Sequence, residues 1–142
     1  AIAKRADQVL LTITTPKMFN AIGFMGRIFD AFTQHEVSVD CVTTSEISVA
    51  VTVDKSTIEN KKLLDQLNNI GTVETESSLT LVSLIGNKML QQTGLAKKVF
   101  SSLEDVNIRL LCLGASPYNF NILVSNIDGN KAIQSLHKEF IG

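Results

Sequence analysis

Apolar residues recur along the chain with two different periods, which predict the same order of strands and helices twice. Short runs rich in β-branched residues, at 9–13 and 81–85, predict strands. The segments that follow, 24–32 and 95–103, carry apolar residues at helical spacing. Each of these two strands is therefore expected to lead into an amphipathic helix.

Each predicted helix is followed by two apolar runs joined by a short polar connection, a pattern typical of a β-hairpin. The predicted hairpin strands are 37–42 with 47–53, and 108–113 with 120–124. A second helix ends each pattern, at about 58–68 and about 130–140. Side chains able to cap these helices stand ahead of them: Asp54 or Ser56, and Asp128.

The two halves of the pattern align with each other. Residues 23–29 match residues 94–100, beginning with a glycine in both cases. The same offset places Cys41 on Cys112 and Ser45 on Ser116. A repeat of this length indicates that the chain holds two copies of one module.

The first copy has a fourth apolar run, at 71–76, which completes the β-α-β-β-α-β order of the ferredoxin-like fold. The second copy ends after its last helix, so its sheet would expose an unpaired edge. We expect residues 1–5 to supply that missing strand. The predicted fold class is α+β, with two interlocked ferredoxin-like modules, 6–77 and 78–142, whose antiparallel sheets carry helices on one face.

A formal net charge of -1 over 142 residues argues against a nucleic-acid partner, because phosphate binding needs a clustered basic face. No apolar run approaches the roughly 20 residues that span a bilayer, and the first residues lack the apolar stretch of a signal peptide. We therefore expect a cytoplasmic protein without a membrane partner. With no Trp and one Tyr, the chain also lacks the sheet aromatics of an RNA-recognition domain.

The sequence contains none of the common catalytic or metal-binding motifs, so we expect no catalytic site and no metal site in it. His35 and His137 stand at the polar ends of predicted helices, where surface or capping roles are expected. Cys41 and Cys112 lie in apolar runs without the spacing of metal ligands. Both are expected to be buried free thiols.

Two places in the first copy are more polar than their counterparts in the second. The connection 14–25 leads into a helix start at Gly23, where backbone N–H groups favour a carboxylate. The next predicted strand carries Asp40 where the second copy has Leu111, and hydroxyl and acidic residues follow at 43–46. Such a site suits an amino acid, whose ammonium group Asp40 would pair with. The alternative is that Gly23 only serves a tight turn and Asp40 is a solvated residue at a strand end.

At these residues the chain resembles a known family, the paired ACT domains at the C-terminal end of aspartate kinases, particularly the lysine-sensitive single-function type. The resemblance covers essentially the whole chain. Its most specific parts are residues 18–29 with a Gly-Phe-Met core, residues 37–49, residues 84–87, and the turn 114–116 with Asn119. ACT domains of this family have the β-α-β-β-α-β order, and the first is inserted into the second, which agrees with the role expected for residues 1–5.

The resemblance implies that two chains form a homodimer through their ACT domains. It also implies that L-lysine, acting as a feedback inhibitor, binds at the interface between the first ACT domains of the two subunits. Carried over by position, the lysine contacts are Met18, Gly23, Phe24, Met25, Ser38, Val39, Asp40, Thr44 and Ser45. This chain departs from the family at Ala21, where lysine-sensitive members have a serine. The loss of that hydrogen bond costs about 0.5 to 1.5 kcal/mol, too little to abolish binding by itself.

The resemblance further implies that the catalytic half of such an enzyme, with its ATP and magnesium sites, lies outside this chain, which needs no cofactor of its own. The parent enzyme would transfer the γ-phosphate of ATP to the β-carboxylate of L-aspartate, the first step towards lysine, threonine and methionine. Two alternatives stay open for the chain. It could sense threonine, alone or jointly with lysine, or it could be a dimerisation scaffold that has lost its ligand.

Overall fold

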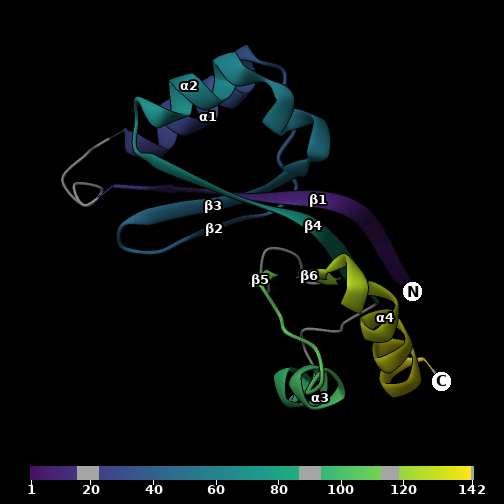
Figure 1. Ribbon diagram of the computed structural model, residues 1–142. Coiled ribbons are helices and arrows are strands. Elements are labelled where there is room, and N and C mark those ends of the chain that lie inside the picture. The colour runs from purple at the N-terminus through teal and green to yellow at the C-terminus, as the bar shows by residue number, and fades with distance from the viewer. Residues whose placement is uncertain (16–22, 87–93, 113–118, 142) are drawn as a thin grey trace. The chain divides into compact units, whose positions relative to one another are not determined.

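The computed structural model describes residues 1–15, 23–86, 94–112 and 119–141. The chain divides into two compact units (Figure 1). Residues Gln8–Ser77 form one of them, which we call the inserted unit. The other, the flanking unit, combines Ala1–Asp7 with Ser78–Gly142. Each unit has its own helices and hydrophobic core.

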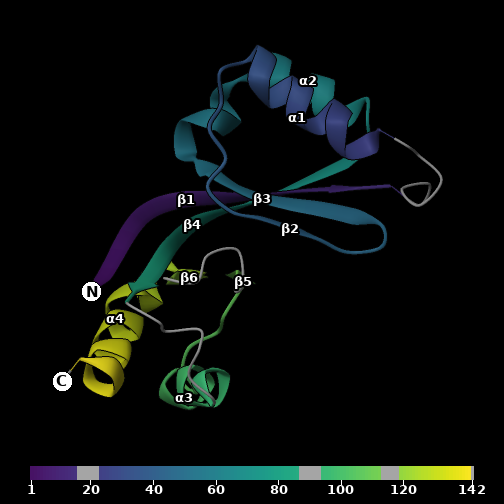
Figure 2. The ribbon, with the colours of Figure 1, turned by 180° about the vertical axis from the view of Figure 1, so that it is seen from behind.

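The inserted unit follows the predicted order of elements. It contains the second part of β1 (Ile2–Thr14), α1 (Phe24–Gln34), β2 (Val42–Thr44), β3 (Ser48–Asp54), a short 3₁₀ helix η2 (Lys55–Glu59), α2 (Lys61–Asn68) and the first part of β4 (Thr72–Ile85). Its strand order is β2-β3-β1-β4, with antiparallel pairing of β1 with β3 and of β2 with β3. Helices α1 and α2 lie side by side over one face of these strands (Figures 1 and 2).

Alternate residues of the inserted unit's strands form its core, as the period of two predicts. Val9, Leu11 and Ile13 of β1 are fully buried. They belong to one cluster with apolar side chains of the two helices, among them Phe32 of α1 and Leu63 of α2. The apolar side of each amphipathic helix therefore faces the sheet.

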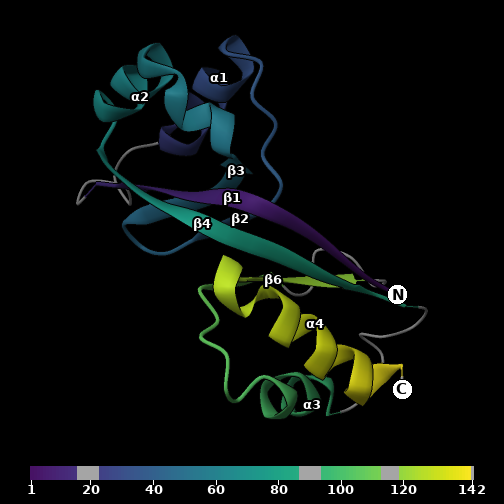
Figure 3. The same cartoon turned by 45° about the vertical axis from the view of Figure 1, so that its right-hand side comes forward.

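The flanking unit repeats this plan. Its elements after β4 are α3 (Leu95–Ser102), β5 (Leu110–Cys112), β6 (Asn119–Ser125) and α4 (Asn126–Phe140). Its strand order is β1-β4-β6-β5, with antiparallel β4–β6 and β5–β6 pairs. Helices α3 and α4 lie together on one side of these strands (Figure 3). The predicted α+β class with two ferredoxin-like modules is confirmed. In the described part of the chain, no helix has the length and apolar character needed to cross a bilayer.

Strands β1 and β4 each contribute to both units. In the flanking unit, the amino group of Ala1 donates to Ile85 O at 2.8 Å, and Ile85 N donates to Ala1 O at 2.8 Å. The apolar pattern predicts two separate runs in place of each of these strands, and this prediction is wrong, because β1 and β4 are each continuous. The polar stretches where the apolar pattern lapses stay extended on either side of Asp7 (φ 56°) and Ser78 (φ 61°). These two positive-φ residues stand at the unit boundaries.

Three details of the predicted elements need correction. Helix α4 begins at Asn126 with Ser125 at the N-cap position, so Asp128 lies in the first turn instead of capping it. The predicted helix 58–68 is divided, because η2 ends at Glu59 and Asn60 caps α2. Of the predicted strand 37–42, only its end belongs to β2. The ends of these elements depend on the hydrogen bonds that single polar residues form. The spacing of apolar residues does not predict such bonds.

Replacing Asn60 by alanine is expected to lower the free energy of unfolding by about 1 kcal/mol, as measured by urea denaturation. Asn60 Oδ1 accepts a hydrogen bond from Leu63 N at 3.1 Å, and its amide nitrogen lies 3.2 Å from His35 Nδ1. The substitution removes both partners. Lys62→Ala, at an exposed position of the same helix, serves as the control. Equal unfolding midpoints for the two variants would contradict the capping role.

Candidate functional site

The first group of predicted site residues stands at the start of α1. Gly23 occupies the N-cap position with φ 91° and ψ 1°, a left-handed conformation that favours glycine. As a glycine, Gly23 offers no side-chain cap, so the N-cap residue leaves the first N–H groups of the helix without a side-chain acceptor of its own. Phe24 is buried and Met25 is 40% exposed. The helix start thus has the geometry that accepts a carboxylate. Met18 lies outside the described residues.

The second group surrounds Asp40, which is exposed on the segment leading into β2. Asp40 N donates to Thr52 O at 3.0 Å, and Thr52 N donates to Cys41 O at 3.0 Å. Cys41 N donates to the hydroxyl Oγ1 of Thr52 at 2.9 Å. Ser38 is exposed like Asp40, whereas Val39 packs against the core between them. Alternation along this segment therefore presents Ser38 and Asp40 together to solvent.

Thr44 and Ser45 lie at the turn between β2 and β3, both exposed. The Ser45 hydroxyl lies 2.6 Å from the hydroxyl of Ser48, and Ser45 N donates to Ser48 O at 2.9 Å. Ile47 N donates to Ser45 Oγ at 3.4 Å. These bonds hold the Ser45 hydroxyl in one place, so the turn presents a preorganised polar group.

One hydrogen bond connects this turn to the end of β1. Thr15 N donates to Ile47 O at 2.8 Å, directly after the register pair of Thr14 with Ser48. The connection between β1 and α1 therefore leaves the sheet beside the β2–β3 turn. Its other end is Gly23, where α1 begins.

Sequence analysis missed two residues that hold this region together, Thr52 and Ser48. Thr52 is fully buried in β3, at a position where the second copy has Leu123. A hydroxyl in the middle of an apolar strand was a usable signal, because a buried polar group needs a partner. Ser48 gave no such signal, since its partner Ser45 is identified only by the geometry of the turn.

Replacing Thr52 by valine is expected to lower the free energy of unfolding by about 1 to 3 kcal/mol. Valine keeps the shape of the side chain but removes the oxygen that accepts from Cys41 N, and Cys41 is buried. Guanidinium denaturation of the variant, compared with Thr43→Val at an exposed position of β2, measures the effect. A loss no greater than that of the control would show that this hydrogen bond does not stabilise the Asp40 segment.

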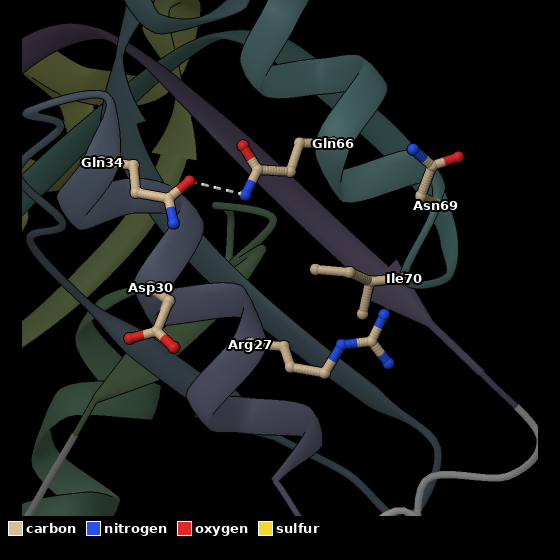
Figure 4. A pocket seen from close by; sticks show the side chains of 6 residues that line it. All are labelled: Arg27, Asp30, Gln34, Gln66, Asn69 and Ile70. Carbon is tan, nitrogen blue, oxygen red and sulfur yellow. Dashed lines mark hydrogen bonds between the residues drawn. The ribbon is translucent and has the colours of Figure 1, made fainter.

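A separate polar groove lies between the two helices of the inserted unit (Figure 4). Its cavity measures about 270 Å³, and it is lined by Arg27, Asp30, Gln34, Gln66, Asn69 and Ile70. None of the predicted site residues belongs to this lining. The groove is therefore distinct from the Asp40 region and the start of α1.

The histidines and cysteines lie largely where the sequence indicates. His35 is the C-cap residue of α1, and its ring also contacts Asn60 and Gln66. His137 stands in the last turn of α4. Both cysteines are thiols outside any disulfide, but Cys112 is half-buried instead of buried. Among the described residues, no group of three or more His, Cys, Asp or Glu side chains is placed to hold a metal ion.

Sequence comparison places these features among known proteins. The sequence profile of the family described as "ACT domain" matches residues 11–60 and 82–140. Lysine-sensitive aspartokinase 3 of Escherichia coli is 40% identical over 144 residues, which cover 96% of this chain and 32% of the relative. Aspartokinase 1, chloroplastic, of Arabidopsis thaliana is 30% identical over 151 residues, covering 99% of this chain and 26% of the relative. The chain thus spans about a third or less of the length of these relatives.

Solved structures agree with the sequence comparison. E. coli aspartokinase III in complex with aspartate and ADP superimposes with a TM-score of 0.92 at 39% identity, over 100% of this chain and 33% of that one. The same enzyme in complex with lysine and aspartate gives 0.89 at 40% identity, with the same coverage. A putative C-terminal regulatory domain of aspartate kinase from Porphyromonas gingivalis gives 0.87 at 24% identity, over 100% of this chain and 97% of that one. At that identity it supports the fold alone.

Proposed function

This chain belongs to the ACT domain family, and we propose that it is the regulatory region of an aspartate kinase that binds L-lysine as a feedback inhibitor. One observation in the structure carries the proposal. The backbone of the exposed residue Asp40 is hydrogen-bonded to a buried threonine, Thr52, in the same unit as a hydrogen-bonded serine turn. The name of the E. coli relative and the lysine in one of its crystal structures favour lysine as the ligand.

The proposed site combines three kinds of contact. Backbone N–H groups at the start of α1, from Gly23 to Met25, would bind the carboxylate of lysine. Asp40 would pair with an ammonium group, and the hydroxyls at the β2–β3 turn would accept or donate the remaining hydrogen bonds. The full set of proposed contacts is Met18, Gly23, Phe24, Met25, Ser38, Val39, Asp40, Thr44 and Ser45.

We propose that two inserted units meet around this site in a homodimer. Among the described residues, strand β2 is the edge strand of the inserted unit, with a neighbouring strand on one of its sides only. Exposed large apolar side chains of the described part of this unit include Met25, Val42 and Ile47. A second copy would cover both features at once, and lysine bound between the copies would stabilise the pair.

In the parent enzyme we expect lysine to act on catalysis through this dimer. The catalytic part, outside this chain, would bind ATP and magnesium and transfer the γ-phosphoryl group to the β-carboxylate of L-aspartate. Lysine would favour an inactive arrangement, and the shift between arrangements cannot exceed its difference in affinity for them.

The test is isothermal titration of this chain with L-lysine, alongside sedimentation of the chain with and without lysine. We expect saturable binding and a larger dimer fraction in the presence of lysine. Titration with L-threonine, alone and after lysine, separates a threonine or joint sensor from a lysine sensor. A dimer that binds neither amino acid would establish the scaffold interpretation instead, for which the replacement of serine by Ala21 is the motivating observation.

A further inference from the structure

The groove between α1 and α2 is lined by residues that share one side of each helix. Arg27, Asp30 and Gln34 follow the helical spacing along α1, and Gln66 of α2 stands three residues before Asn69, the C-cap residue of that helix (Figure 4). Ile70, which follows Asn69, adds an apolar side chain. Two opposite charges, three amides and one apolar group therefore line a single cavity within the inserted unit.

A chain of side-chain hydrogen bonds fixes one end of this groove. Asn60 Oδ1 accepts from Leu63 N, so the Asn60 amide nitrogen faces His35 Nδ1 at 3.2 Å. His35 therefore accepts at Nδ1 and donates from Nε2 to Gln66 Oε1 at 3.1 Å, a tautomer assigned from this network. Gln66 Nε2 donates to Gln34 Oε1 at 2.9 Å. Each group donates to the next, and the direction of the chain is determined by the cap of α2.

This chain of bonds leaves a donor pointing into the groove. The oxygen of Gln34 is occupied by Gln66, so the Gln34 amide nitrogen is the atom that it presents to the cavity (Figure 4). His35 and Asn60 hold the Gln66 side chain, which in turn bonds Gln34. These glutamine side chains therefore lose little conformational entropy when a ligand binds to them. The groove is thus more ordered than a solvated gap between two helices requires.

The two charges in the groove are not bonded to each other. Among the six described residues drawn in Figure 4, the one hydrogen bond joins Gln34 and Gln66. Arg27 and Asp30 both extend towards solvent from the same helix. A guanidinium recognises a carboxylate, and a carboxylate recognises an ammonium group. A phosphate or nucleotide would be repelled by Asp30, and a simple cation by Arg27.

We infer that this groove is a second binding site, for a small zwitterion that carries a carboxylate and an ammonium group. Arg27 binds its carboxylate, Asp30 binds its ammonium group, and the Gln34 amide donates to a carboxylate oxygen. Ile70 contacts a short apolar side chain. The cavity of about 270 Å³ lies just below the range of sites for drug-sized ligands, which fits a ligand the size of an amino acid. The inference goes beyond the proposed lysine site and shares no residue with it.

The experiment is an NMR titration of the Asp40→Ala variant with L-alanine, following the side-chain amide resonances of Gln34, Gln66 and Asn69. The Asp40→Ala background removes the proposed lysine contact, so the result does not depend on that site. We expect saturable shifts in the millimolar range. Propionate and ethylamine, which each carry one of the two charges, are expected to bind at least about tenfold more weakly.

Two pairs of variants test the charges. Arg27→Gln and Asp30→Asn are each expected to weaken L-alanine binding by about tenfold or more. Their matched controls, Lys62→Gln and Asp65→Asn, remove the same charges from exposed positions of α2 outside the lining and are expected to change nothing. Absent shifts, equal affinity for propionate alone, or equal effects of the controls would each overturn the inference. Failure of lysine to bind elsewhere on the chain would leave it intact.

Discussion

Replacing Asp40 by alanine is expected to weaken the binding of L-lysine by roughly 10- to 150-fold, which corresponds to about 1.5 to 3 kcal/mol for a hydrogen bond to a charged group. The carboxylate is the group proposed to pair with the ligand's ammonium. Its backbone is anchored to Thr52, so the substitution removes the charge without releasing the segment. Isothermal titration of the wild type and the variant measures the difference directly.

Two controls sharpen this prediction. Asp40→Asn keeps a hydrogen-bond acceptor but removes the charge, and it is expected to bind lysine with an affinity between those of the wild type and Asp40→Ala. Glu46→Ala removes a neighbouring exposed carboxylate that is not among the proposed contacts, and it is expected to leave the affinity unchanged. If the wild type binds lysine and Asp40→Ala binds it equally well, Asp40 is not the ammonium partner.

Replacing Phe32 by alanine is expected to destabilise the inserted unit by about 3 to 5 kcal/mol, the largest loss of stability that we predict. Phe32 is 2% exposed, and its ring centroid lies 6.2 Å from that of Phe29. Removing the ring leaves a cavity between α1 and the sheet, in a cluster where the neighbouring side chains are also buried. For a domain stabilised by about 5 to 15 kcal/mol in total, such a loss is a large share of its stability.

Urea denaturation followed by circular dichroism measures this loss. The control is Phe100→Ala on α3, whose side chain is 48% exposed, with an expected change within about 0.5 kcal/mol. A similar loss in both variants would mean that burial does not decide the contribution of these rings.

The structure gives a physical reason why the two copies differ. In the first copy the buried hydroxyl of Thr52 accepts a hydrogen bond from Cys41 N, in addition to the backbone bonds that Thr52 makes with Asp40 and Cys41. At the corresponding position of the second copy, the Leu123 side chain has no hydroxyl to accept such a bond, although its backbone oxygen accepts from Arg109 N. Leu123 is also fully buried, so both copies keep their cores while only one of them presents an anchored carboxylate.

The order of elements, the internal repeat and the α+β class were all predictable from the amino-acid sequence. These follow from periods of two and about four residues, which are local properties of the chain. The sequence also indicated the Asp40 region, because a charged residue there breaks the match with Leu111 of the second copy. The lysine contacts assigned by resemblance stay predictions.

Other features depend on partners that are distant in sequence, so they could not be predicted before the folded chain was known. The continuity of β1 and β4 through their polar stretches shows only in the strand pairing, for example between Ala1 and Ile85. The groove between α1 and α2 depends on His35, which meets side chains 25 and 31 residues away. Apolar periodicity tells which side of an element is buried, but not which polar side chains meet across two elements, since that depends on the packing of the whole unit.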